Sequence, residues 1–344
     1  MKRLFVLFLS LCLLLPLYSC TAREDPVSAS TKTSTSAAAA SSDAPTQQSP
    51  KTKDNSDTPP EEYAPLFWRV NDRDGNTAYL FGTIHVGDER SDTVMRQLEP
   101  FLSQCDALAV EFDSETYGKD LNAQIQMLSA FVYKDGTTIK DHIPAELYSR
   151  AVDVLKSAKI YNALFDYYQP AIWSQFIEQA LLMKCDLSAE KAMDSLLLKS
   201  AHSSGKEILE VESASMQTDL LRSFPDAYYI CSMRSDLNGI EESQDALKRL
   251  YEYWLSGEES GIENLLLTAD APTNDLTAEE LQLIRDCNDR MLAKRNIDMA
   301  EKAKEYLQSG KTAFFAVGTA HFIGDGGIIS LLKNEGYSVE RIGF

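Results

Sequence analysis

The pattern of apolar and polar positions near the start of the folded region predicts strands and one helix. Two apolar runs flank the turn sequence Arg-Asp-Gly-Asn-Thr, which predicts a β-hairpin over residues 66–84. Apolar residues spaced by four then predict a helix over 91–104. The apolar run Ala-Leu-Ala-Val-Glu-Phe-Asp predicts a short strand at 107–113. The N-terminal unit is therefore expected to be strand, strand, helix, strand.

The middle of the chain, from about residue 120 to 310, has mainly the periodicity of helices. Helices are expected at 144–158, which begins with Pro144, and at 170–183 and 192–205. Residues 206–213 form the one strand expected in this region. Thr277 with Glu280 makes a capping box at the start of a long predicted helix, 278–309.

The C-terminal end repeats the order of elements found at the N-terminal end. It predicts a strand at 312–317, a Gly-Thr-Ala-His turn, a helix at 326–334 and a strand at 337–343. Neither unit can bury both faces of its own strands, so the two are expected to join in one sheet. The fold class is therefore α/β. We expect a single domain whose central β-sheet is built from N- and C-terminal strand-loop-helix-strand units, with a large helical insertion.

Residues 1–19 are typical of a secretory signal, because two basic residues precede an apolar run that is short for a spanning helix. The run ends in Leu-Tyr-Ser-Cys, which resembles the lipobox of bacterial lipoproteins and implies that Cys20 is lipid-modified, for example with palmitate. An ordinary secretory signal followed by a chance cysteine is the alternative. Residues 20–60 are rich in Ser, Thr, Ala and Pro and predict a disordered tether, which leaves 61–344 as the folded domain.

The formal charge of −19 disfavours binding to nucleic acid and to anionic lipid headgroups. Contact with the membrane is therefore expected through the N-terminal lipid, with the protein outside the cytoplasm and anchored to the bacterial cell membrane. The folded part contains Cys105, Cys185, Cys231 and Cys287, and their spacing includes no Cys-x-x-Cys pair. A thiolate zinc site is thus disfavoured, while one or two disulfides and four buried thiols both remain open.

Two of the four histidines lie in twin settings, "TAYLFGTIHVGD" from residue 77 and "TAFFAVGTAHFIGD" from residue 312. Gly82 and Gly318 come directly after strands and permit a sharp turn or a close backbone approach. The histidines three residues later, His85 and His321, are then displayed at the loops. In one shared sheet both turns would lie at the edge where α/β proteins bind ligands. Two neutral imidazoles would supply half of a metal site, or a general base and its partner.

Three further polar residues fall on elements predicted to be buried. Glu111 shares a strand face with small alanines, so its carboxylate needs a cation or an arginine nearby. Arg295 lies on the apolar stripe of the long helix with Asn296 beside it, and either could meet Glu111 or an anionic group of a substrate. The simpler alternatives are a strand-end carboxylate in water and an arginine that extends to solvent. Asp88 and Asp325 are ligands or turn residues.

These residues together resemble the TraB/PrgY/GumN family, which includes the Tiki metalloproteases. The resemblance covers about 64–344 and rests on Gly82 with His85, Glu111, Arg295 with Asn296, and Gly318 with His321. The stretch "KEILEVESASMQ" resembles the middle of the family pattern and implies substrate-binding roles for Glu212 and Gln217. "AMD" departs from the family's Gly-Met/Leu-Asp, so Asp194 is a weaker match. The resemblance implies a fold related to haem-binding ChaN and erythromycin esterase.

Two functions from different classes follow. The first is a cell-surface, divalent-metal-dependent hydrolase, a peptidase that acts on peptides or exposed protein segments, as the Tiki members are described. His85, His321 and Glu111 would hold zinc, manganese or cobalt, and the ion would activate water. Arg295 or Asn296 would stabilise the oxyanion or grip a substrate carboxylate. The second is a non-catalytic surface lipoprotein that binds a peptide, a pheromone or haem through the same side chains.

Overall fold

The apolar runs at the two ends of the chain form one β-sheet in the computed structural model, which describes residues 63–266 and 276–344. The strands of these residues are β1 (Phe67–Asn71), β2 (Thr77–Thr83), β3 (Ala107–Val110), β4 (Glu207–Glu210), β5 (Ala313–Gly318) and β6 (Ser338–Arg341). Their order across the sheet is β4-β3-β5-β2-β1-β6, which confirms the prediction of one α/β sheet. The signal peptide, the lipidated Cys20 and the tether predicted for 1–60 lie outside the described residues.

The centre of the sheet is made from strands that are far apart in the sequence. β1 and β2 form the predicted antiparallel hairpin. β5 lies between β2 and β3 and is parallel to both, so the C-terminal unit fills a gap in the N-terminal one. Every residue of β5 is buried, as expected for a parallel strand covered on both faces. Because β2 and β5 run in the same direction, the turns that follow them lie at the same edge of the sheet.

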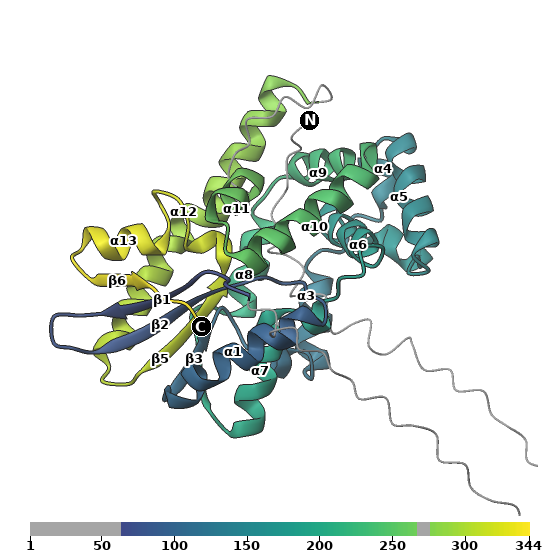
Figure 1. Ribbon diagram of the computed structural model, residues 1–344. Helices are drawn as coiled ribbons and strands as arrows, with labels where there is room; N and C mark the ends of the chain where they lie inside the picture. The colour runs from purple at the N-terminus through teal and green to yellow at the C-terminus, as the bar shows by residue number, and fades with distance from the viewer. Residues whose placement is uncertain (1–62, 267–275) are drawn as a thin grey trace, which may run out of the picture.

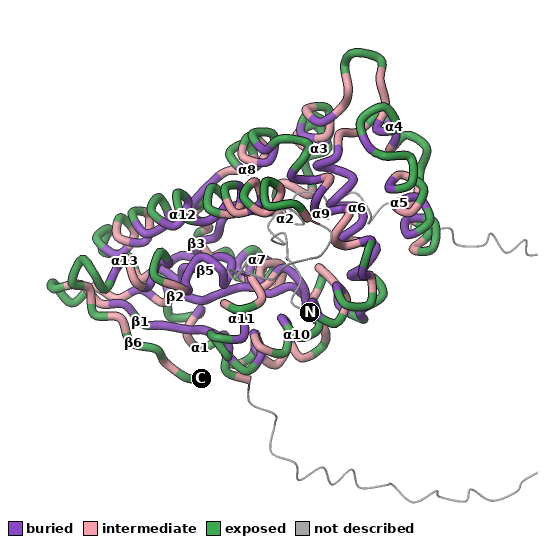
Figure 2. The backbone as a smooth tube through the Cα atoms, turned by 90° about the horizontal axis from the view of Figure 1, so that it is seen from above, coloured by how far each residue is buried: buried purple, intermediate pink, exposed green. Residues whose placement is uncertain are grey.

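The helices that follow β2 and β5 cover opposite faces of the sheet. The connection β2–α1–β3 moves across the sheet in one direction, with α1 at Arg90–Gln104. The connection β5–α13–β6 moves in the other direction, with α13 at Ile328–Asn334. Since such crossovers are right-handed, opposite directions place their helices on opposite faces. Figure 2 shows α13 and α12 (Ala278–Gln308) along one side of the strands and α1 along the other.

The region between β3 and α12 is mostly helical, as predicted. Its helices are α2 (Ser114–Tyr117), α3 (Leu121–Ser129), α4 (Ile139–His142), α5 (Ala145–Ser157), α6 (Pro170–Leu182), α7 (Met193–Ser204), α8 (Ala214–Arg222), α9 (Asp226–Asn238), α10 (Ile240–Ser256) and α11 (Glu259–Leu266). Figure 1 shows α4, α5, α6 and α9 as a group beside the sheet. In contrast, α7 packs against α1 and β3. Within the described part of the chain, no helix has both the length and the apolarity to cross a membrane.

The long helix α12 begins at the predicted capping box. The Thr277 hydroxyl accepts the backbone N–H of Glu280, and the Glu280 carboxylate accepts the backbone N–H of Thr277. One face of the helix is buried, and it includes Arg295 and Asn296 among apolar neighbours. The stripe predicted for this helix thus carries two polar side chains into the interior of the protein.

Three local expectations change with the structure. The strand predicted at 107–113 ends at Val110, so Glu111 is the first residue after β3 instead of a strand residue. Pro144 is the N-cap of α5 and not its first helical residue. The cysteines of the described residues are all free and buried, which decides between disulfides and buried thiols in favour of thiols.

Candidate active site

The two Gly-Thr-x-His turns lie side by side, as the repeat predicts. Thr83 at the end of β2 is paired with Gly318 at the end of β5. A Cβ placed on Gly318 would lie 3.6 Å from His321 Cδ2 and 3.7 Å from His85 Nε2, so both imidazoles face this glycine. His85 is 7% exposed and His321 is fully buried. Two residues that are 236 positions apart are therefore neighbours in one buried site.

The predicted turn glycines are required for space and not for a left-handed backbone. Neither Gly82 nor Gly318 has a positive φ. A Cβ on Gly82 would lie 2.3 Å from the Thr319 hydroxyl, and one on Gly318 would lie 3.3 Å from Glu111 Oε1. The glycines therefore let the two turns and the Glu111 carboxylate approach one another closely.

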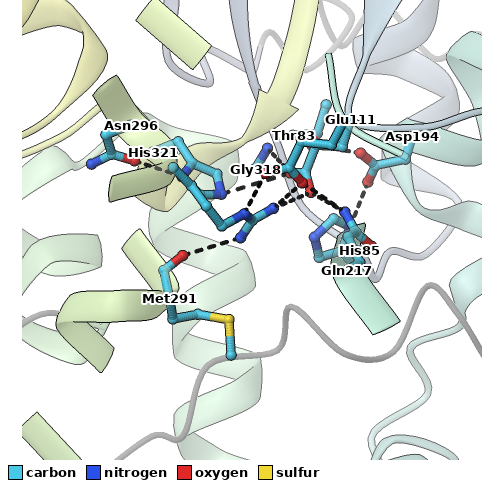
Figure 3. A network of polar contacts seen from close by, with 11 residues as sticks. Thr83, His85, Glu111, Asp194, Gln217, Met291, Asn296, Gly318 and His321 are labelled. Atoms are coloured by element: carbon cyan, nitrogen blue, oxygen red, sulfur yellow. Dashed lines mark hydrogen bonds and ion pairs between the residues drawn. The ribbon is translucent and has the colours of Figure 1, made fainter. Parts of the chain in front are cut away.

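His85 is oriented by a carboxylate from α7. Its Nδ1 lies 2.9 Å from Asp194 Oδ2, and the Thr83 hydroxyl donates to Asp194 Oδ1 at 2.7 Å. Burial alone would raise the pKa of Asp194, but the charge and hydrogen bond of His85, together with the Thr83 hydroxyl, lower that pKa. Asp194 is therefore ionised and holds the His85 ring with Nε2 directed toward Gly318 (Figure 3). This partner was the weak match in the sequence.

His321 is oriented by a neutral amide from α12. Its Nδ1 lies 2.6 Å from Asn296 Oδ1, while Asn296 donates from Nδ2 to the carbonyl of Gly326 at 2.9 Å. The second bond sets the amide orientation, so Nδ1 of His321 carries the proton and Nε2 carries the lone pair. Nε2 is buried without a hydrogen-bond partner among the described residues. Burial and the nearby charge of Arg295 hold the pKa of His321 well below its usual value, so the ring is neutral.

Glu111 is the centre of a buried charge network. Its Oε1 accepts the backbone N–H of Gly318 at 2.9 Å, and its Oε2 accepts from Arg295 and Gln217, each at 3.0 Å. Arg295 also donates to both carboxylate oxygens of Glu212, at 2.6 and 2.7 Å. This bidentate geometry is strong and fixes the guanidinium. The structure therefore brings together all of the polar site residues predicted within 61–344.

The roles open to these residues are narrower than the sequence implies. Both functional groups of Asn296 are used, one by His321 and one by Gly326, so this side chain positions His321. Asp88 accepts from Arg90 and Tyr251 at the start of α1, which makes it a turn residue. Asp325 is exposed. The sequence did not indicate that Thr83 would hold Asp194 and that Asp194 would in turn hold His85.

The site residues do not form a preassembled binding site for a divalent cation. Within residues 63–266 and 276–344, no three His, Cys, Asp or Glu side chains meet the geometry of a metal site. Of the predicted ligands His85, His321 and Glu111, the last two are close neighbours, with Glu111 Oε1 3.9 Å from His321 Nε2. The donor chemistry nevertheless fits, because each ring has its Nδ1 occupied by a partner, the arrangement typical of metal-binding histidines. The unpartnered Nε2 of His321 is the atom such an ion would satisfy.

The charges gathered at the site also fit a cation. Glu111 and Glu212 both contact Arg295, and the ionised Asp194 lies beside them through His85. When both imidazoles are neutral, as binding of a metal ion through Nε2 requires, these groups carry two more negative than positive charges. A divalent ion would balance that excess in a site where buried charge is costly when unpaired.

The chain is similar to proteins named as metalloproteases and to a protein named as uncharacterized. The sequence profile of the TraB/PrgY/gumN family matches residues 66–341. The chain is 25% identical over 326 residues to the "Metalloprotease TIKI homolog" of Amphimedon queenslandica, covering 80% of this chain and 61% of that protein. It is 23% identical over 309 residues to the "Metalloprotease TIKI1" of Homo sapiens, covering 77% and 59%. It is also 23% identical over 257 residues to the "Uncharacterized protein YbaP" of Escherichia coli (strain K12), covering 74% and 87%. The chain thus spans about three fifths of the length of the TIKI proteins.

Proposed function

The chain belongs to the TraB/PrgY/gumN family, and on that basis we propose that it is a divalent-metal-dependent hydrolase that cleaves peptides. The single observation that carries the proposal is the pair of adjacent buried imidazoles whose Nδ1 atoms are both held by partners. This leaves the Nε2 edges of the rings on one side, facing Gly318. Relatives named metalloproteases support the choice of hydrolysis over other metal chemistry.

His85 and His321 would hold the ion through Nε2, and Glu111 would hold it through Oε1. When bound, a divalent ion lowers the pKa of water and polarises a carbonyl. The residues of the chain keep these ligands in the correct state. Asn296 fixes the tautomer of His321.

Arg295 and Gln217 keep the Glu111 carboxylate in one orientation. Both bind Oε2, which leaves Oε1 on the side of His321. Glu212 neutralises Arg295 and holds it in place through two hydrogen bonds. In this assignment Arg295 and Gln217 position Glu111, which is a ligand of the ion. Glu212 acts through its contact with Arg295.

The direct test combines metal content with peptide products. The full chain is purified, its metal is measured by elemental analysis, and a peptide pool is incubated with it and examined by mass spectrometry. Wild type should contain about one ion per chain and produce new peptide termini. The double variant His85→Ala/His321→Ala should lose both properties. His142→Ala is the matched control, because His142 is exposed and remote from the site, and it should behave as wild type.

Two results would contradict the proposal. Equal, negligible metal in wild type and the double variant would exclude a metal held by these histidines. Peptides that are depleted but intact would show capture without turnover, which is the binding function considered from the sequence.

We further propose that the enzyme acts outside the cytoplasm, because the lipobox-like sequence ending at Cys20 predicts an N-terminal lipid. Its substrates would then be peptides in that compartment. Cys20→Ala should move the protein from the membrane fraction to the soluble fraction. An unchanged distribution would remove the support for this location.

A further inference from the structure

A small cavity opens beside His85. Its floor is formed by the two Gly-Thr-x-His turns, and its walls are apolar side chains from α10 and α11, namely Leu250, Trp254, Ile262 and Leu266. Its volume is about 40 Å³. One water molecule needs roughly 10–15 Å³ by the same kind of measure, so the space fits a few heavy atoms and not an aromatic ring.

The walls of this cavity carry no permanent charge. Trp254 and Ile262 are fully buried. Trp254 also donates from its indole nitrogen to the carbonyl of Gly82 at 2.8 Å, which fixes the wall to β2. Among the residues that line the cavity, His85 is the one with a titratable side chain. A charged group entering here would lose its hydration without gaining an opposite charge, so the cavity disfavours charged ligands.

Thr319 also lines the cavity, but its hydroxyl is buried against Gly82, where a Cβ would lie 2.3 Å from Oγ1. The turn therefore adds little polar surface to the cavity.

A larger groove adjoins the cavity. It has a volume of about 380 Å³ and lies between α12 and the loop after His321. The two spaces share Leu266 and Ala320, and the groove is lined by polar residues that include Asn296. An extended peptide in the groove could therefore place one side chain in the small cavity, beside His85.

We infer that the small cavity is the specificity pocket of this enzyme and accepts the short aliphatic side chain, such as that of Ala, Val or Thr, of the substrate residue beside the cleaved bond. This inference rests on the proposed peptidase function. It adds a substrate class, since peptides with an aromatic or charged residue at this position are excluded by size or by desolvation.

The experiment that tests this inference enlarges the small cavity. Wild type, Leu250→Ala and Leu247→Ala are incubated with a randomised peptide library, and the new termini are sequenced by mass spectrometry. Leu247 is the matched control, because it is buried on the same helix to a similar degree but does not line the cavity. Wild type and Leu247→Ala should prefer short aliphatic residues at one position beside the cleaved bond. Leu250→Ala should shift that preference toward Leu and Phe by about 10-fold or more.

Different results would contradict the pocket assignment and the proposed peptidase function. Clear cleavage without a residue preference, or a preference that Leu250→Ala leaves unchanged, would overturn the pocket and leave the hydrolase intact. A wild-type protein that produces no new termini at all would overturn the proposed function, and the pocket assignment with it.

Discussion

The two Gly-Thr-x-His turns have nearly the same sequence and the same position at the sheet edge, yet their histidines have different partners. His85 is held by a carboxylate, Asp194, which comes from the start of α7. His321 is held by a neutral amide, Asn296, from the middle of α12. The charge of Arg295 lowers the pKa of His321, whereas His85 has the negative charge of Asp194 at its side. Repeated sequence therefore produced repeated geometry but not repeated electrostatics, because the partners come from elements outside the repeat.

The largest expected effect comes from removing the positive charge of Arg295, which lies next to His321. Arg295→Met leaves Glu111 and Glu212 buried without their counter-ion, which should lower the free energy of unfolding by about 3–5 kcal/mol. Urea unfolding measures this loss. Arg69→Met is the matched control, since its partner Glu340 is largely exposed, and it should cost at most about 1 kcal/mol. Similar losses in the two variants would show that the buried network is not what stabilises this side of the site.

The second-largest expected effect is a loss of metal affinity when the carboxylate partner of His85 is replaced. Asp194→Asn keeps the shape of the His85 partner but removes its charge, and it should weaken metal binding about 10- to 100-fold. Isothermal titration with Zn²⁺, Mn²⁺ and Co²⁺ measures the affinity. Asp92→Asn, which breaks a surface pair with Lys191, should have no effect. If Asp194→Asn bound metal as tightly as wild type, the carboxylate would not be part of a metal-binding unit.

The pH dependence of stability should also distinguish the site groups in the metal-free protein. The folded pKa of His321 is lowered below 6.5, so below pH 6.5 the unfolded chain binds this proton and the folded protein does not. Stability should therefore fall as pH decreases from 6.5, by up to about 1.4 kcal/mol per pH unit from this one group. Asp194 has a folded pKa lowered from 3.8, so its contribution is present above 3.8 and is lost only at lower pH.

The variant that isolates this effect is His321→Asn, which keeps a donor for Asn296 but does not titrate. Unfolding is followed between pH 7.5 and 5 with a chelator present. The slope of stability against pH should be smaller in the variant than in wild type. Equal slopes in the two proteins would mean that His321 titrates normally in the folded state.

The smallest expected effect compares the two threonines. Thr83→Val removes the hydroxyl that donates to Asp194 and should cost about 1–2 kcal/mol of unfolding free energy. Thr319→Val removes a hydroxyl with no partner among the described residues and should change stability by about 0.5 kcal/mol or less. Thermal and urea unfolding of the two variants measure the difference. Equal costs would show that the first turn gains nothing from its bond to α7.

Much of the fold could be predicted because its signals are local. Asp-Gly-Asn between two apolar runs predicts the β1–β2 hairpin, and Thr277 with Glu280 predicts the start of α12. The repeated strand-turn-helix-strand order predicted one sheet with both turns at one edge, and the parallel pairing of β2 with β5 confirms it. The end of β3 was predicted three residues too late, since the apolar run continues past the last paired residue.

The site was predictable only in part. His85 and His321 were selected from the repeated Gly-Thr-x-His turns. Glu111 and Arg295 were selected because polar residues on apolar elements need partners, and the structure pairs them with each other. Asp194 was noted only as a weaker match to the family pattern, because nothing near it in sequence connects it with His85. The contacts of Asn296 with His321 and the Gly326 carbonyl had no signal in the sequence.

Residue pattern along the chain was sufficient to identify the elements, the single sheet and the histidines that meet at its edge, because periodicity and turn chemistry act over a few residues. The assignment of Asp194 to one histidine and Asn296 to the other depended on how α7 and α12 pack against the sheet. That packing brings together residues separated by 109 positions in one case and 25 in the other. Hydrogen bonds and charges act over a few ångströms in space, so their partners follow from the packed chain and not from distance along it.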